Sequence, residues 1–138
     1  MNTNWLDEFG IVEEDQSPYG NGKPRNIILE KSLEFALEII EYCEGLQANK
    51  KYVISNQLLK SGTSIGANVR EAQNAESKAD FIHKLKIAAK EAEETEYWLI
   101  LCERSKNYPS VGSMMKDIKV IILILGKIIS TAKSNSNK

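Results

Sequence analysis

Asp80 and His83 are the two residues of this sequence whose spacing most resembles part of a metal site. A D-x-x-H spacing puts both side chains on one face of a helix, and such pairs supply half of the dimetal sites found in helix bundles. A complete site needs a second pair, but His83 is the only histidine of the chain. Asp80 also follows Ser77 by three residues, which is the spacing of a helix-capping signal. We therefore expect Asp80 to cap a helix, His83 to be exposed and no metal to bind.

A glutamate-rich segment could supply the paired carboxylates of an acid–base catalyst. It contains Glu91, Glu93, Glu94 and Glu96. Their spacing distributes them over different sides of a helix, and Lys86 and Lys90 lie within a turn or so of them, as on a solvated face. No motif supplies a base for the serines of the chain, and no glycine-rich phosphate loop is present. We predict that the protein is not an enzyme and requires no cofactor or small-molecule substrate.

The segment 57–71, QLLKSGTSIGANVRE, has the apolar periodicity of a helix but contains two glycines. Gly62 and Gly66 are each less favourable than alanine in a helix interior by about 0.5–1 kcal/mol. Close approach of a neighbouring backbone to this small-residue surface would offset that cost. The polar residues would fix the register between helices or form a polar site at a subunit contact. The residues assigned to this helix crossing are Ser61, Gly62, Ser64, Gly66, Asn68 and Glu71.

Hydrophobic periodicity predicts four helices to carry these side chains. They span residues 26–48, 52–75, 77–106 and 111–131. Asn49 and Ser110 are the expected start signals of the second and fourth helices. The third helix has a heptad-like seam, which is typical of helices crossing at about 20°. That seam consists of Phe81, Leu85, Ala88, Ala92, Thr95, Leu99 and Cys102. We predict an all-α protein, an antiparallel up-down four-helix bundle.

The first and fourth helices have wide apolar faces. On the first helix, one seam is formed by Ile28, Ser32, Phe35, Ile39, Tyr42 and Leu46, with Ile40 and Cys43 in an adjoining stripe and an acidic ridge outside. The fourth helix is apolar over most of its girth, so it needs cover on more than one side. We assign that surplus to an oligomer interface formed by Val120, Leu123 and Ile124.

The remaining segments and the composition indicate a soluble intracellular protein of one domain. Residues 1–25 are predicted to be a flexible arm and linker because prolines and glycines interrupt them, and residues 132–138 a disordered tail. Cys43 and Cys102 suit buried, reduced thiols. The run from Val120 to Leu125 is far shorter than the roughly 20 residues that cross a bilayer. No signal peptide is visible, so we expect a cytoplasmic protein that makes no membrane contact.

A resemblance to a known family lies in the segment SGTSIGANVREAQNAESKADFIHKLKIAAKEAEETEYWLILCERSK. The shared pattern consists of Gln57, Ser61, Ser64, Ile65, Asn68, Glu71, Ser77, Phe81, Ala88, Glu91, Tyr97 and Trp98. It resembles the four-helix-bundle family named for the protein encoded in intervening sequences of bacterial 23S ribosomal RNA. The resemblance extends over about residues 26–130 and implies up-down bundles assembled into ring-shaped homopentamers. The chain is also similar to accessory proteins of diversity-generating retroelements, which are pentamers that bind nucleic acid and a reverse transcriptase.

Two functions therefore remain open. The first is a non-catalytic scaffold or adaptor, a homo-oligomeric ring with five copies favoured. The second is a nucleic-acid-binding accessory protein for RNA or DNA, with a reverse transcriptase as a further partner. A net charge of −1 gives no global attraction to nucleic acid, but a ring would multiply a local basic cluster fivefold. The candidate nucleic-acid contacts are Lys60, Arg70, Lys84, Lys86 and Lys90.

Overall fold

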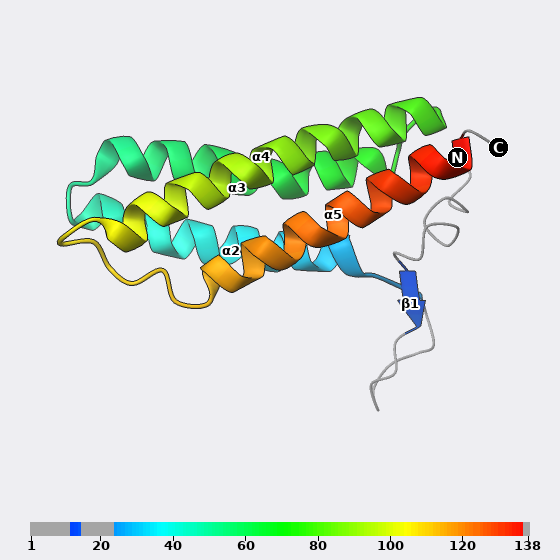
Figure 1. Ribbon diagram of the computed structural model, residues 1–138. Helices are drawn as coiled ribbons and strands as arrows, with labels where there is room; N and C mark the ends of the chain where they lie inside the picture. Colours follow the sequence, from blue (N-terminus) through cyan, green and yellow to red (C-terminus); the bar gives the residue numbers. More distant parts are fainter. Residues whose placement is uncertain (1–11, 15–23, 137–138) are drawn as a thin grey trace.

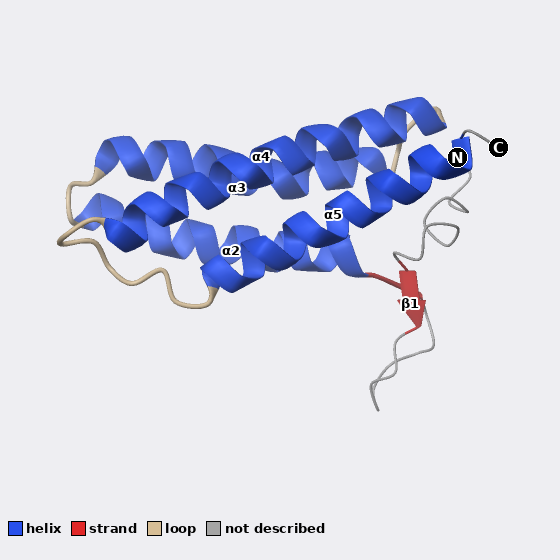
Figure 2. Ribbon diagram, viewed as in Figure 1, coloured by secondary structure: helices blue, strands red, loops and turns tan. Residues whose placement is uncertain are grey.

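The computed structural model describes residues 12–14 and 24–136 and contains four long helices (Figures 1 and 2). These are α2 (Ile27–Ala48), α3 (Tyr52–Ala72), α4 (Lys78–Arg104) and α5 (Met114–Ser136). The predicted all-α, four-helix fold is confirmed. Two strands of three residues, β1 (Val12–Glu14) and β2 (Pro24–Asn26), pair antiparallel directly before α2. The sequence did not predict this short hairpin; the rest of the predicted N-terminal arm lies outside the described residues.

Successive helices lie alongside one another, and their connections fall at alternate ends of the bundle (Figure 1). Residues 49–51 and 105–113 form the connections at one end, and residues 73–77 form the connection at the other. Helix α3 packs against both α2 and α4, while α5 packs against α4 and lies along α2. Helix α2 therefore begins, and α5 ends, at the same end of the bundle.

Two side chains define the starts of α2 and α4. The Oδ1 atom of Asn26 accepts a hydrogen bond from the backbone N–H of Leu29 at 3.2 Å. The Nδ2 atom of Asn26 also donates to Oε1 of Gln73 at 2.8 Å, which ties the start of α2 to the end of α3. At α4, the Oγ atom of Ser77 accepts from the N–H of Asp80 at 3.0 Å, as the capping signal predicts. Both caps satisfy N–H groups that have no partner within their helices.

The other predicted start signals are wrong. Asn49 caps the end of α2 instead of starting α3, because its Nδ2 donates to the carbonyl of Gly45 at 3.0 Å. Lys50 then reverses the chain in a left-handed conformation, with a φ of 62°. Ser110 accepts from the N–H of Gly112 at 3.1 Å and so stabilises a turn, and α5 begins only at Met114. The left-handed conformation of Lys50 therefore sets the start of α3, and the turn at residues 110–112 sets the start of α5.

Helix α5 extends to Ser136, beyond the predicted end at residue 131. The predicted disordered tail is therefore wrong as far as Ser136, and residues 137–138 lie outside the described chain. Ala132 is fully buried and continues the core face formed by Leu125 and Ile128. Helix α3 ends earlier than predicted, at Ala72. Packing of the apolar seam, more than the polar composition of the tail, sets the length of α5.

The core runs between the four helices. All seven residues of the predicted α4 seam are buried, which confirms that periodicity. On α2, the predicted seam included Tyr42, but Cys43 is the residue of that turn that is buried in the core. Tyr42 is half-buried, and its hydroxyl donates to the backbone carbonyl of Pro109 at 2.8 Å. In the described part of the chain, no helix combines the length and the hydropathy needed to cross a bilayer.

Candidate functional site

The small-residue face of α3 packs closely against α2. A Cβ atom added at Gly62 would lie 2.8 Å from Cγ2 of Ile39, and one added at Gly66 would lie 3.4 Å from the backbone oxygen of Ser32. Gly62 and Ile39 are both buried. The glycines therefore remove the side-chain volume that would push these two helices apart.

Buried hydroxyl groups bridge the helices beside this crossing. Thr95 of α4 and Ser61 of α3 are 2.9 Å apart through their hydroxyl oxygens, and both residues are buried. The Oγ of Ser55 donates to the carbonyl of Cys43 at 3.1 Å, which joins α3 to α2. Among the described residues, every buried side-chain nitrogen or oxygen has a hydrogen-bond partner. These bonds account for the polar residues of the core as parts of the packing.

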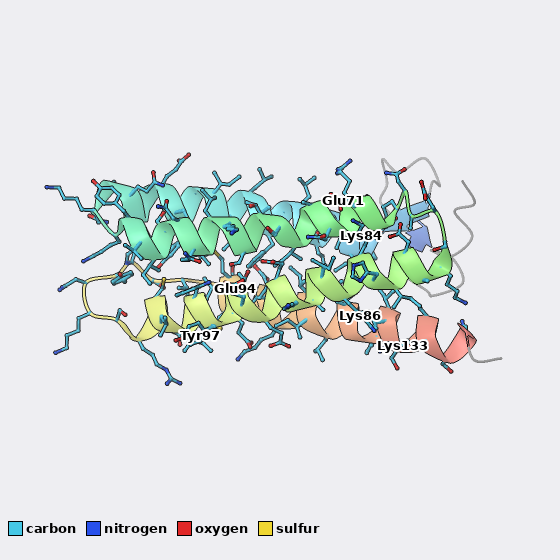
Figure 3. The ribbon with its side chains drawn as sticks, turned by 90° about the horizontal axis from the view of Figure 1, so that it is seen from above. Glu71, Lys84, Lys86, Glu94, Tyr97 and Lys133 are labelled. Carbon is cyan, nitrogen blue, oxygen red and sulfur yellow. The ribbon has the colours of Figure 1, made fainter. Side chains whose placement is uncertain are left out.

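Ser64 and Asn68 hydrogen-bond within their own helix. The hydroxyl of Ser64 donates to the carbonyl of Lys60 at 2.6 Å, and Nδ2 of Asn68 donates to the carbonyl of Ser64 at 2.9 Å. Both bonds connect successive turns of α3. Glu71 instead reaches a neighbouring helix, because its carboxylate lies 3.0 Å from Nζ of Lys84 on α4 (Figure 3). Since 58% of the Glu71 side chain is exposed, this ion pair contributes little to the stability of the bundle.

The residues first considered for metal or acid–base chemistry are dispersed. Asp80 belongs to the capping arrangement of α4, and His83 is exposed. Glu94 accepts a long hydrogen bond of 3.4 Å from Nε1 of Trp98. Within residues 12–14 and 24–136, no three histidine, cysteine or acidic side chains are grouped in a way that could hold a metal ion. The geometry thus groups none of these residues into a reactive centre.

The two cysteines are free thiols buried in the core. Burial raises the pKa of Cys43 to about 11, and it also raises the pKa of Cys102. Nucleophilic attack by cysteine requires the thiolate. Both side chains are therefore suited to packing and poorly suited to reaction.

A groove of about 330 Å³ separates α2 from α5 and contains an acidic pair. Glu38 of α2 faces Asp117 of α5 there, with Phe35 and Ile121 among the apolar residues of the lining. Burial raises the pKa of Glu38, and the nearby carboxylate of Asp117 raises it further. The carboxylates of Glu38 and Asp117 thus repel one another across the groove when both are ionised.

The candidate interface residues of α5 have different environments. Ile124 is partly buried against the core, Val120 lines the groove between α2 and α5, and Leu123 is 64% exposed. Helix α2 has an exposed apolar line, formed by Leu33, Leu37 and Ile40. Ile40 was predicted to lie in the apolar stripe beside the seam, and no role was predicted for Leu33 or Leu37. Their spacing of four and three residues was the available signal, since it puts them on one helix face.

The candidate nucleic-acid contacts have different surroundings. Lys60, Arg70 and Lys90 are exposed. Lys84 faces Glu71, whereas Lys86 lies next to Lys133 of α5, as Figure 3 shows. The adjacent ammonium of Lys133 lowers the pKa of Lys86. The structure thus brings together two lysines from distant parts of the chain; Lys86 was a predicted contact, and Lys133 was not.

The four helices and their seams define an all-α four-helix-bundle protein. Residues 25–127 match the family model of the 23S rRNA-intervening sequence protein, and the chain belongs to this family. It is also similar to the crystal structure of a protein of unknown function from the S23 ribosomal protein family of Bacteroides thetaiotaomicron VPI-5482. That comparison gives 48% identity and a TM-score of 0.70, and it covers 74% of this chain and 97% of the other. No curated protein matches this chain. The resemblance found in the sequence is therefore confirmed.

Proposed function

We propose that this protein is a non-catalytic scaffold of the cytoplasm whose antiparallel up-down bundles associate into a homo-oligomeric ring of five copies. The observation that supports this proposal is the exposed apolar line on α2. Leu33, Leu37 and Ile40 are 52%, 60% and 39% exposed, respectively, and occupy one helix face. Burying such a line against another protein surface would be favourable by about 25 cal/mol for each Å² of apolar area removed from water. Contiguous exposed apolar surface is a feature of protein–protein contacts.

The oligomeric state tests this proposal directly. Light scattering coupled to size exclusion, together with native mass spectrometry, should give about five times the 15.5 kDa chain mass. Leu37→Lys should reduce that mass, because a charge would be placed in the centre of the apolar line. Val53→Lys is the matched control, since Val53 is 75% exposed but lies on α3. A wild-type protein with the mass of one chain at every concentration would overturn the proposal.

The alternative function is a nucleic-acid-binding accessory protein, with a reverse transcriptase as a further partner. The observation that favours it is the convergence of Lys86 and Lys133 from two helices, with Lys90 one turn further along α4. Adjacent ammonium groups attract phosphate, and such binding weakens steeply as salt concentration rises. A gel shift with RNA and with DNA at about 50 mM salt should then be reduced by Lys86→Glu together with Lys133→Glu. No shift at that salt concentration would remove this function.

A further inference from the structure

The exposed apolar line of α2 lies beside acidic side chains. Leu33, Leu37 and Ile40 recur at steps of four and three residues, so they line one side of the helix over about 10 Å. Glu41 and Glu44 are exposed and follow this line within a turn of helix. Helix α2 as a whole holds five glutamates and one lysine. Its outer face is thus an apolar centre bordered by negative charge.

The outer face of α5 has the opposite charge. Leu123 is 64% exposed, and the exposed residues Lys119 and Lys127 lie at helical spacing on the same side of α5. Beside Leu123, Gly126 leaves open space, because an added Cβ there would have no neighbour within 4 Å. A shallow depression of about 540 Å³ results, lined in part by Leu123, Gly126 and Lys127. This face therefore offers an apolar hollow bordered by positive charge.

We propose that these two faces bind one another between adjacent copies of the chain, a pairing that rests on the ring proposed above. The leucines of α2 in one copy would enter the depression beside Gly126 of α5 in the next copy. The glutamates bordering Leu37 would then face the lysines bordering Leu123. Opposite charges at the border favour this pairing and its orientation, while the apolar centre supplies most of the binding free energy.

Charge also argues against the symmetric alternatives. Two α2 faces brought together would oppose glutamates to glutamates, and two α5 faces would oppose lysines to lysines, which is unfavourable at an interface. A contact between two different faces is heterologous, so each copy retains one free face for a further copy. Repeating such a contact builds a ring when its rotation closes, as the five-copy assembly proposed above requires.

A mixing experiment distinguishes this pairing from symmetric contacts. Leu37→Lys damages only the α2 face, and Leu123→Glu damages only the α5 face. Each variant alone should have the mass of one chain by light scattering at a concentration where the wild type is assembled. A 1:1 mixture should recover a mass of at least two chains, because each variant supplies the face that the other lacks. Far-UV circular dichroism should show unchanged helix content, since both positions are exposed.

The outcomes separate the pairing from the ring itself. An assembled wild type whose Leu123→Glu variant keeps the full mass would overturn the pairing and leave the ring proposal in place. A mixture in which both variants stay at single-chain mass would also overturn the pairing. A monomeric wild type would overturn both proposals. If its α5 lysines shifted RNA in a gel, that face would be assigned to nucleic acid.

A charge-reversal series provides an independent measurement. Lys119→Glu together with Lys127→Glu should raise the dissociation constant of the assembly at least tenfold. Glu41→Lys together with Glu44→Lys should do the same, and combining all four changes in one chain should restore at least part of the affinity. Additive losses in the combined variant would contradict the pairing, because the reversed charges would then not face one another.

Discussion

Replacing Gly62 by alanine should destabilise the fold, although alanine is the better residue in most helix interiors. The new Cβ would lie 2.8 Å from Cγ2 and 3.0 Å from Cγ1 of Ile39. Ile39 is fully buried, so it has little room to move. Overpacking of this kind costs about 1–3 kcal/mol. The gain in helix propensity of about 0.5–1 kcal/mol offsets only part of that cost.

The matched control is Gly45→Ala in α2. An added Cβ at Gly45 has no neighbour within 4 Å, so this variant should show the propensity gain without the steric cost. The difference in unfolding free energy between the two variants should therefore be about 1–3 kcal/mol. Urea titrations followed by far-UV circular dichroism measure it, at one protomer concentration because association adds to apparent stability. Two variants of equal stability would show that α3 does not approach α2 as closely as described.

A second substitution tests the identity of the contact. Ile39→Ala removes Cγ1 and Cγ2 but leaves Cβ, which would lie 3.3 Å from the methyl group introduced at position 62. Ile39→Ala alone should cost about 2–5 kcal/mol, because it leaves a cavity. In that background Gly62→Ala should no longer destabilise. An undiminished loss in the double variant would mean that Ile39 is not the obstructing side chain.

Two further predictions concern titratable groups. The raised pKa of Glu38 means that the folded state holds this proton to a higher pH than the unfolded chain, so stability falls as pH rises through that window. Glu38→Gln should therefore raise the melting temperature at pH 7.5 more than at pH 4.5, whereas an equal effect at both pH values would argue against repulsion from Asp117. Cys43 and Cys102 should be almost unreactive toward a thiol reagent at pH 8 in the folded protein and should both react in denaturant, since burial raises both pKa values. Rapid labelling of the native protein would contradict their burial.

The sequence was most informative where packing follows local spacing. The α4 seam from Phe81 to Cys102 could be predicted completely, because a heptad pattern requires no knowledge of distant residues. Helix ends were less predictable. The start of α5 depends on the left-handed turn at Gly112, and its end depends on the burial of Ala132. No local pattern in the sequence marks either feature. Ser110 indicates an earlier start of α5, and the polar tail indicates an earlier end.

The exposed surfaces were the hardest part to predict. Lys86 and Lys133 are neighbours only because α4 packs against α5, and no spacing along the chain indicates this. The helical spacing of Leu33 and Leu37 is visible in the sequence. The spacing alone does not decide whether these side chains lie toward the core or toward solvent. The packing of α2 against α3 decides between these two possibilities.

The alternation of the connections has a consequence for anything attached to this protein. A domain joined before α2 and one joined after α5 would both emerge from the same end of the rod. In any assembly whose symmetry axis is parallel to the helices, such cargo would gather on one rim. Of the described residues, the opposite rim would present 49–51 and 105–113 of every copy. The assembly would thus be polar, with one side for attachment and another for contact with its surroundings.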